Sequence, residues 1–309
     1  ENEINYLYRT LLIGGLVLVL LILILLYNRY RLKLKAHETH QKLHKIEIES
    51  ANLKAEAAET RAAIIQAEFE QKKKELDAAR ELQLSMLPAI LPNHNKVSVA
   101  ALMLTATEVG GDYYDFHENE DGVLTIAIGD ATGHGAQAGI MVTATKSLFN
   151  LLADEKNIAD ILRSSNLAIK KMRFTNIFMA FAILRLKENI LELAGAGMPP
   201  AYIYRAKTKT VDSVALKGLP LGSVSDYEYP KTSVKLNSGD VVTIVSDGFP
   251  ELFNSKKESI GFDKIPDLLK GIGDKSPEEI IASFKNSAEE WLNGSRQDDD
   301  MTFVVFKVK

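Results

Sequence analysis

Cysteine is missing from all 309 residues of the chain. The chain therefore has no disulfide, no thiolate nucleophile and no Cys-ligated zinc, which excludes cysteine-dependent phosphatases and proteases. An excess of basic charge is missing too, because 37 Lys and Arg residues face 41 Asp and Glu residues, for a formal net charge of -4. No basic patch with interleaved aromatic residues occurs either. The sequence therefore predicts no binding of nucleic acid.

Charge is absent between Leu11 and Tyr27, a run made almost entirely of Leu, Ile and Val. As a helix, such a run spans roughly 26 Å, close to a hydrocarbon core of about 30 Å. Basic residues follow it at positions 29, 31, 33 and 35, so the positive-inside rule puts the rest of the chain in the cytoplasm. We predict a transmembrane helix over residues 1–28 that anchors the protein in the cell membrane.

Two other interpretations of this apolar run are a cleaved signal peptide and a buried core helix. A signal peptide would need a basic start and a small-residue cleavage site, whereas this chain opens Glu-Asn-Glu and has no such site. Because the first residue is Glu1 and not Met, we expect further sequence, including any part that senses a signal, to lie upstream.

Glycine and proline are absent from residues 29–87, which are rich in Ala, Glu, Lys and Gln, a composition typical of helices. Apolar residues recur there every three or four positions, in one phase through Leu43 and Leu53 and in another through Ile65 and Leu76. We predict a weak coiled coil that forms a homodimer, with a solvated single-helix spacer as the alternative. Pro88 ends the helix, so we place a globular domain at residues 88–309.

Short β-rich runs and helical runs share residues 95–309. Strand patterns lie at 97–105, 112–117, 123–129, 178–187, 190–196, 201–205, 241–246 and 302–308, and helical patterns at 136–154, 158–171, 262–270 and 277–291. The strands follow one another as hairpins and do not alternate with helices. We therefore predict an α+β fold in which antiparallel sheets are flanked by helices in a layered sandwich.

Four acids stand where strands begin or end. Asp112 opens one strand and Asp130 closes the next, so an antiparallel hairpin places them side by side. Asp247 follows the apolar run VVTIVS, and Asp299 precedes the last strand in QDDDMTFVVFKV. Any one of them alone would be a common turn or cap residue. Together, four converging carboxylates would repel one another, and divalent metal resolves the repulsion. Carboxylates, carbonyls and water suit Mg²⁺ or Mn²⁺.

The motifs GGDYYDF, GDATGHG, SDGFPELF and DDDMTF, in this order, resemble those of bacterial SpoIIE/RsbU-type serine/threonine phosphatases of the PP2C-like superfamily. AGAGMPPAYIY, GLPLG and ARELQLSMLP are similar to that family as well, so the resemblance covers roughly residues 76–309. It implies an α/β/β/α sandwich with two Mn²⁺ or Mg²⁺ ions at one edge. It also implies a phosphoserine or phosphothreonine protein as substrate, such as an anti-sigma-factor antagonist of the STAS type.

The same resemblance implies roles for individual residues. Asp130 would bridge both metals, and the Ala131 carbonyl would complete one coordination sphere. Asp112 would serve the first metal, and Asp247 and Asp299 would serve the second, so Asp112 and Asp130 are the candidate catalytic residues. Within the acidic triple, Asp298 and Asp300 remain alternatives to Asp299.

His134 lies inside GDATGHG and raises the question of an imidazole base. Metal ions can activate water without such a base, so we expect His134 to have a structural role. No position matches the superfamily's phosphate-binding arginine, and phosphate recognition is expected to depend on the metals. Two other functions remain open: a catalytically inactive membrane-tethered binding module, and a metal-dependent phosphodiesterase or nuclease, which the acidic composition disfavours.

Overall fold

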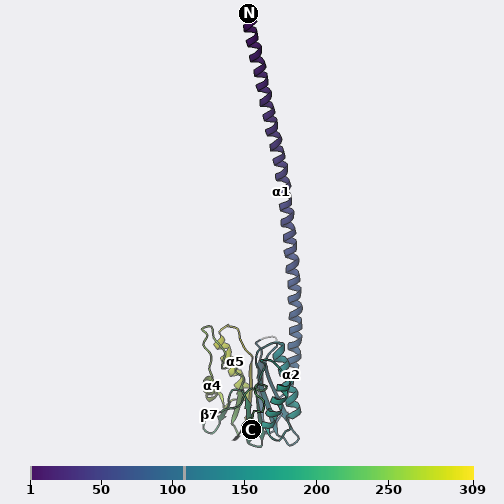
Figure 1. Cartoon of the computed structure of the whole chain (residues 1–309). Coiled ribbons are helices and arrows are strands. Elements are labelled where there is room, and N and C mark those ends of the chain that lie inside the picture. Colours follow the sequence, from purple (N-terminus) through teal and green to yellow (C-terminus); the bar gives the residue numbers. More distant parts are fainter. Residues whose placement is uncertain (1, 107–108) are drawn as a thin grey trace. The chain divides into compact units, whose positions relative to one another are not determined.

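The computed structural model describes residues 2–106 and 109–309. Contacts between residues divide the chain into two units, Glu1–Lys72 and Lys73–Lys309. Helix α1 (Asn2–Ser85) runs through the first unit and into the second without a break (Figure 1). It is therefore continuous helix across both the predicted membrane span and the predicted coiled coil.

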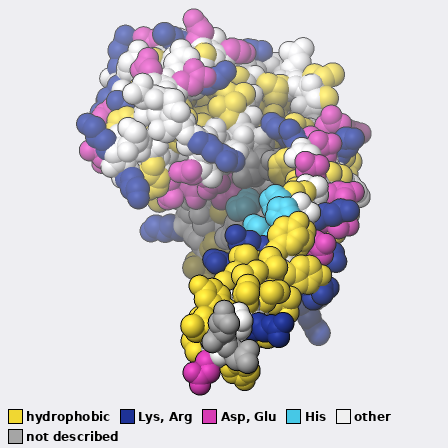
Figure 2. Space-filling view, turned by 90° about the horizontal axis from the view of Figure 1, so that it is seen from above, with side chains coloured by type: hydrophobic (Ala, Val, Ile, Leu, Met, Phe, Trp, Pro, Cys, Tyr) yellow, Lys and Arg dark blue, Asp and Glu magenta, His cyan; other side chains and the backbone are white. Residues whose placement is uncertain are grey.

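The N-terminal part of α1 carries exposed apolar side chains, followed by Lys, Arg and His side chains (Figure 2). Gly14 and Gly15 do not interrupt the helix. Among the described residues, α1 is the helix that is long and apolar enough to cross a membrane. This makes it a candidate membrane span by length and composition.

The end of α1 is set by the prolines that follow it. The amides of Met86 and Leu87 bond to the carbonyls of Gln83 and Leu84 at 3.0 and 3.1 Å, which tightens the last turn. Leu87 precedes Pro88, and a residue before proline is disfavoured in helical conformation. The helix therefore ends at Ser85, two residues earlier than the composition predicts.

Two five-stranded antiparallel sheets form the centre of the second unit. The first sheet has the order β1 (Val97–Leu104), β10 (Met301–Val308), β9 (Val241–Val245), β6 (Ala201–Arg205) and β7 (Thr210–Val214). The second sheet has the order β2 (Asp112–Glu118), β3 (Leu124–Ala131), β4 (Met179–Lys187), β5 (Ile190–Ala196) and β8 (Lys231–Lys235).

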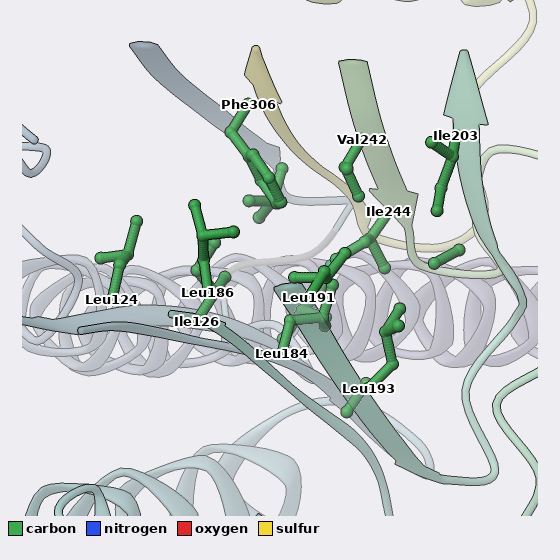
Figure 3. Close-up of a cluster of buried hydrophobic side chains, with 14 of the residues drawn as sticks. Leu124, Ile126, Leu184, Leu186, Leu191, Leu193, Ile203, Val242, Ile244 and Phe306 are labelled. Carbon is green, nitrogen blue, oxygen red and sulfur yellow. The ribbon is translucent and has the colours of Figure 1, made fainter. Parts of the chain in front are cut away.

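The two sheets pack face to face over a buried aliphatic core (Figure 3). Leu124, Ile126 and Leu184 of the second sheet and Ile203 and Val242 of the first point into the space between the two sheets (Figure 3). This face of each strand is apolar at alternate positions, because successive side chains of a strand point to opposite faces. The opposite face of each sheet is left to be covered by helices.

Two helices cover each outer face. Helices α2 (Ala136–Leu152) and α3 (Ile158–Lys171) pack on the second sheet, and α4 (Lys264–Ile272) and α5 (Pro277–Leu292) pack on the first. Figure 1 shows α2 on one side of the sheets and α4 and α5 on the other. Ser276 and Glu279 form a capping box at the start of α5, as the sequence pattern predicts. The predicted α+β sandwich of four layers, α/β/β/α, is confirmed.

Strands β7 and β8 were not predicted from the sequence. Their segments, TVDSV and KTSVK, are short and polar, and most of their side chains are exposed. Each lies at the edge of its sheet, where one side of the strand faces solvent. Because most of their side chains face solvent, these two strands need few apolar residues, and their sequences resemble those of loops.

Candidate active site

The β2–β3 hairpin brings Asp112 and Asp130 directly opposite each other. Asp112 is the first residue of β2, and Asp130 is the last but one of β3. The register continues along the whole hairpin to the pair formed by Glu118 and Leu124. The predicted juxtaposition of the two acids at one rim of the sheet is what the hairpin produces.

The carboxylate of Asp112 is only half satisfied by hydrogen bonds. Its Oδ2 atom accepts bonds from the hydroxyls of Ser246, at 2.8 Å, and Thr302, at 2.6 Å. Its Oδ1 atom is buried and has no hydrogen-bond partner among the described residues. Burial, followed by the charge of Asp130, raises the pKa of Asp112 well above its usual value. A buried carboxylate oxygen without a partner is suited to a cation.

Asp130 is affected by the charges of several neighbouring acids. Burial, together with the charges of Asp247 and Asp299, raises the pKa of Asp130 to about 8. Burial and then the charge of Asp299 raise the pKa of Asp247 to about 6. The charges of Asp247 and Asp299 therefore oppose the ionisation of Asp130, and the charge of Asp130 opposes that of Asp112. The structure brings Asp112, Asp130, Asp247 and Asp299 to one rim, although they come from both sheets.

Asp299 and Asp300, the last two acids of the acidic triple before β10, lie in different environments. Asp300 is buried, and its two oxygens accept bonds of 2.7 Å from the amides of Ala106 and Gly111. Asp299 has an exposed side chain, and its Oδ1 atom accepts a bond from the amide of Asp300. The surrounding protein still removes enough water to raise the pKa of Asp299. Asp300 thus holds the backbone at Ala106 and Gly111, whereas the side chain of Asp299 is available to bind a ligand.

Close backbone approach at this rim requires glycine. A Cβ atom on Gly111 would lie 2.6 Å from the carbonyl oxygen of Ala131 and 2.9 Å from Oδ1 of Asp130. A Cβ atom on Gly248 would collide with the carbonyl oxygen of Asp300. Any larger residue at either position would push the acids apart. The Ala131 carbonyl, a predicted ligand, therefore lies in the same tight cluster as Asp130.

His134 lies in the loop between β3 and α2, with an exposed side chain. Gly133 and Gly135 on either side have φ values of 84° and 81°, which favour glycine. The charge of His134 acts to lower the pKa of Asp299, although burial raises that pKa overall. This proximity between His134 and Asp299 was not predicted from the sequence.

Gln83 and Glu251 were also missed. The buried Gln83 side chain donates to the Gly110 carbonyl at 2.7 Å and accepts from the Gly110 amide at 3.0 Å. The charge of Glu251 contributes to the raised pKa of both Asp130 and Asp247. Gln83 lies in the motif ARELQLSMLP, but neither the motif nor the helix periodicity shows which loop its side chain contacts. The spacing of Glu251 four residues after Asp247 was the available signal for the second.

The residues at this rim fit a divalent metal by their chemistry. The donors are carboxylates and a carbonyl, which Mg²⁺ and Mn²⁺ prefer, and Asp112 offers a buried oxygen with no partner. In residues 2–106 and 109–309, however, no three acidic or His side chains stand close enough to hold an ion as they are. Side-chain rearrangement of the acids would accompany metal binding.

Residues 120–309 match the family model described as Stage II sporulation protein E (SpoIIE). The chain belongs to the SpoIIE family. Phosphoserine phosphatase RsbU of Bacillus subtilis is 27% identical over 243 residues, which cover 77% of this chain and 71% of RsbU. Of four other curated relatives, the chain spans between 24% and 58% of the length. The resemblance to SpoIIE/RsbU-type proteins is confirmed.

Solved structures show the same SpoIIE-type, PP2C-like fold. The SiaA-PP2C domain of Pseudomonas aeruginosa has a TM-score of 0.69 at 21% identity, covering 79% of this chain and 98% of that domain. RsbX in complex with magnesium has a TM-score of 0.56 at 16% identity, covering 71% of this chain and 99% of RsbX. Since RsbU is named a phosphoserine phosphatase, the family membership and the fold together support a protein phosphatase.

Proposed function

We propose that this SpoIIE-family protein is a metal-dependent protein serine/threonine phosphatase that acts from the cell membrane. The observation that carries the proposal is the unpartnered, buried Oδ1 atom of Asp112 beside Asp130, whose own ionisation is opposed by Asp247 and Asp299. A cation would satisfy that oxygen and neutralise the repulsion. Magnesium in the related fold of RsbX supports this choice of ion.

The residues that would hold two Mn²⁺ or Mg²⁺ ions are Asp112, Asp130, the Ala131 carbonyl, Asp247 and Asp299. When bound, such ions supply Lewis acidity toward a phosphoryl group and activate water at neutral pH. The chain's own contribution is positioning. Ser246 and Thr302 fix the orientation of Asp112, and Asp300 holds the backbone of Gly111 against the rim. His134 is not required as a base in this scheme.

The substrate in this proposal is a phosphoserine or phosphothreonine protein, specifically an anti-sigma-factor antagonist of the STAS type. The name of RsbU as a phosphoserine phosphatase supports the substrate class. The apolar N-terminal part of α1 would hold the protein in the membrane, with the phosphatase domain on the cytoplasmic side. Residues 29–87 would pair two copies as a coiled coil, which would cover apolar side chains such as Leu43, Leu53 and Phe69 that are exposed in the single chain.

The full chain in detergent micelles, incubated with a serine-phosphorylated STAS protein, tests the proposal. Phosphate release should require Mn²⁺ or Mg²⁺ and stop with excess chelator. Asp130→Asn and Asp247→Asn should each lower the rate at least about a hundredfold, with unchanged circular dichroism. Asp121→Asn, in the turn at the far end of the β2–β3 hairpin, is the matched control and should retain the rate. Full activity of Asp130→Asn, or activity in excess EDTA, would contradict the two-metal assignment.

A further inference from the structure

Half of the histidines of the chain lie in one short stretch of helix α1. Of the 6 His residues, His37, His40 and His44 occur together in the sequence HETHQKLH. This stretch is continuous helix and its side chains are exposed, so the three histidines do not belong to a core. Figure 2 shows the cyan His side chains gathered beyond the apolar N-terminal part of the helix.

The spacing puts these imidazoles on one face of the helix. With about 3.6 residues per turn, positions 37, 40, 44 and 47 fall within roughly 80° of arc. Residues three or four apart are neighbours on a helix surface, with about 5–6 Å between their Cβ atoms. His40 and His44 are neighbours in this way, and Glu47 follows on the same face. The stretch therefore presents two imidazoles side by side, with a carboxylate next to one of them.

The side-chain contacts leave His40 and His44 available to a ligand. Nδ1 of His44 lies 3.9 Å from Oε2 of Glu47, which leaves the Nε2 atom of the same ring for another partner. His40 forms no hydrogen bond or ion pair with the described residues. His37 is already engaged, because its Nε2 atom lies 3.0 Å from Nε2 of Gln41. A ring with one nitrogen toward a carboxylate and the other nitrogen open is typical of a metal-binding histidine.

Neither helix stability nor the predicted coiled coil explains these histidines. Residues 29–87 are otherwise rich in Ala, Glu, Lys and Gln, which favour helix more strongly than His does. The predicted seam runs through Leu43 and Leu53, and the same spacing continued toward the N-terminus passes through positions 39 and 36. The seam thus lies beside the histidines, and pairing of two helices would leave them accessible.

We propose that His40 and His44 chelate one divalent transition-metal ion of the class of Zn²⁺, Ni²⁺ or Cu²⁺. Imidazole is a preferred ligand of these ions, and two His residues four apart on a helix bind zinc in known sites. The described residues contain no group of three or more acidic or His side chains placed to hold an ion, so water completes the coordination of this two-residue chelate. The ion belongs to a different class from the Mg²⁺ or Mn²⁺ that carboxylates prefer. This inference does not depend on the proposed phosphatase function.

Calorimetric titration of the full chain in detergent micelles with Zn²⁺ tests the proposal. Excess Mg²⁺ is present throughout, so that the acids of the candidate active site are offered the ion they prefer. We expect a Zn²⁺ site that saturates at one ion per chain and that His40→Gln and His44→Gln each weaken at least about tenfold. Gln favours helix more strongly than His, so both variants should keep the helix, which circular dichroism checks.

His117→Gln is the matched control. His117 also lies beside a carboxylate, at 2.8 Å from Asp154, but no His stands four residues from it in the sequence. This variant should keep the affinity for Zn²⁺. Hydrogen exchange of the backbone amides of residues 40–44 gives a second readout. Zn²⁺ should slow this exchange in the unmodified chain and in His117→Gln but not in His44→Gln, because a chelate across one turn opposes local opening of the helix.

Three results would overturn the inference: no binding of Zn²⁺ by the unmodified chain in excess Mg²⁺, an unchanged affinity in His44→Gln, or an equal loss of affinity in His117→Gln. One ion shared by two chains would contradict a chelate within a single helix. The proposed phosphatase function is tested separately, through Asp130→Asn, and stands or falls independently of these titrations.

Discussion

Asp112 and Thr302 belong to different sheets, and the Thr302 hydroxyl donates a 2.6 Å hydrogen bond to Oδ2 of Asp112. The second donor to that oxygen, Ser246, follows β9 of the first sheet. The candidate active site therefore lies where the two sheets meet at one rim. The acids of the β2–β3 hairpin are held in place by hydroxyls from the opposite sheet.

Replacement of Thr302 by Val should weaken metal activation. The substitution keeps the shape of the side chain and removes a donor to a buried carboxylate, a bond worth about 1.5–3 kcal/mol. Because the anionic form of Asp112 loses support, we expect a higher Mn²⁺ concentration for half-maximal phosphatase activity. Thr243→Val is the matched control, since the Thr243 hydroxyl is buried without a hydrogen-bond partner among the described residues. Equal Mn²⁺ requirements in both variants would show that the Thr302 bond has no role in metal binding.

The metal-free protein should lose stability as the pH rises from about 4 to about 8. In the folded state, burial and neighbouring acids raise the pKa of Asp130 to about 8 and that of Asp247 to about 6. In the unfolded chain both pKa values return to about 3.9. Within this window the folded protein holds more protons than the unfolded chain, so the free energy of unfolding falls as the pH increases.

Urea unfolding in excess EDTA across this pH range measures the effect. Asp130→Asn should flatten the pH dependence of the free energy of unfolding, whereas Asp121→Asn, an exposed acid at the far end of the hairpin, should leave it unchanged. Saturating Mn²⁺ should reverse the slope, because metal binds the deprotonated acids. A slope that is the same in Asp130→Asn and in the unmodified protein would mean that Asp130 does not titrate in this window.

Replacement of His134 by Asn should preserve most of the turnover. The side chain is exposed in the loop before α2, and the proposed metals supply the activation of water. Its charge acts on Asp299, so a modest change in Mn²⁺ requirement is expected. The measurement is kcat on a phosphoserine protein at saturating Mn²⁺. A loss as large as that of Asp130→Asn, without a loss of stability, would assign His134 a direct part in the reaction.

The length of the linker helix should affect the phosphatase rate in a periodic way. Helix α1 continues without a break to Ser85. Near its end, the Gln83 side chain forms hydrogen bonds with both the amide and the carbonyl of Gly110, which lies two residues before Asp112. Rotation of a paired helix could therefore change how Asp112 is held, by shifting an equilibrium of a few kcal/mol. Three or four residues inserted near Ala58 should change the rate markedly, and seven should largely restore it.

Rates for this insertion series are measured on the full chain in membranes. As a control, Gln83→Ala combined with each insertion should remove the dependence on length, because the helix then no longer contacts Gly110. If every insertion length gives the same rate with Gln83 intact, the helix serves only as a tether.

The sequence alone predicted antiparallel sheets flanked by helices and the positions of the acids along the chain, and the resemblance to a known family implied the order of the layers. Apolar patterns marked eight of the ten strands of the described residues within two residues, because one or both faces of these strands are buried. The hairpin rule placed Asp112 opposite Asp130 from local spacing alone. Strands β7 and β8 left no such pattern, since most of their side chains are exposed to solvent and need not be apolar.

Only the tertiary structure decided which groups surround those acids. The different environments of Asp299 and Asp300 depend on the backbone of residues 106 and 111, nearly 200 positions away in the chain. The bonds from Ser246 and Thr302 to Asp112, and from Gln83 to Gly110, likewise join segments that meet only after the sheets pack. The local conformational preferences of a Ser, Thr or Gln residue are the same whether or not its side chain bonds to a distant part of the chain. Its role is therefore set by long-range packing, which residue spacing does not encode.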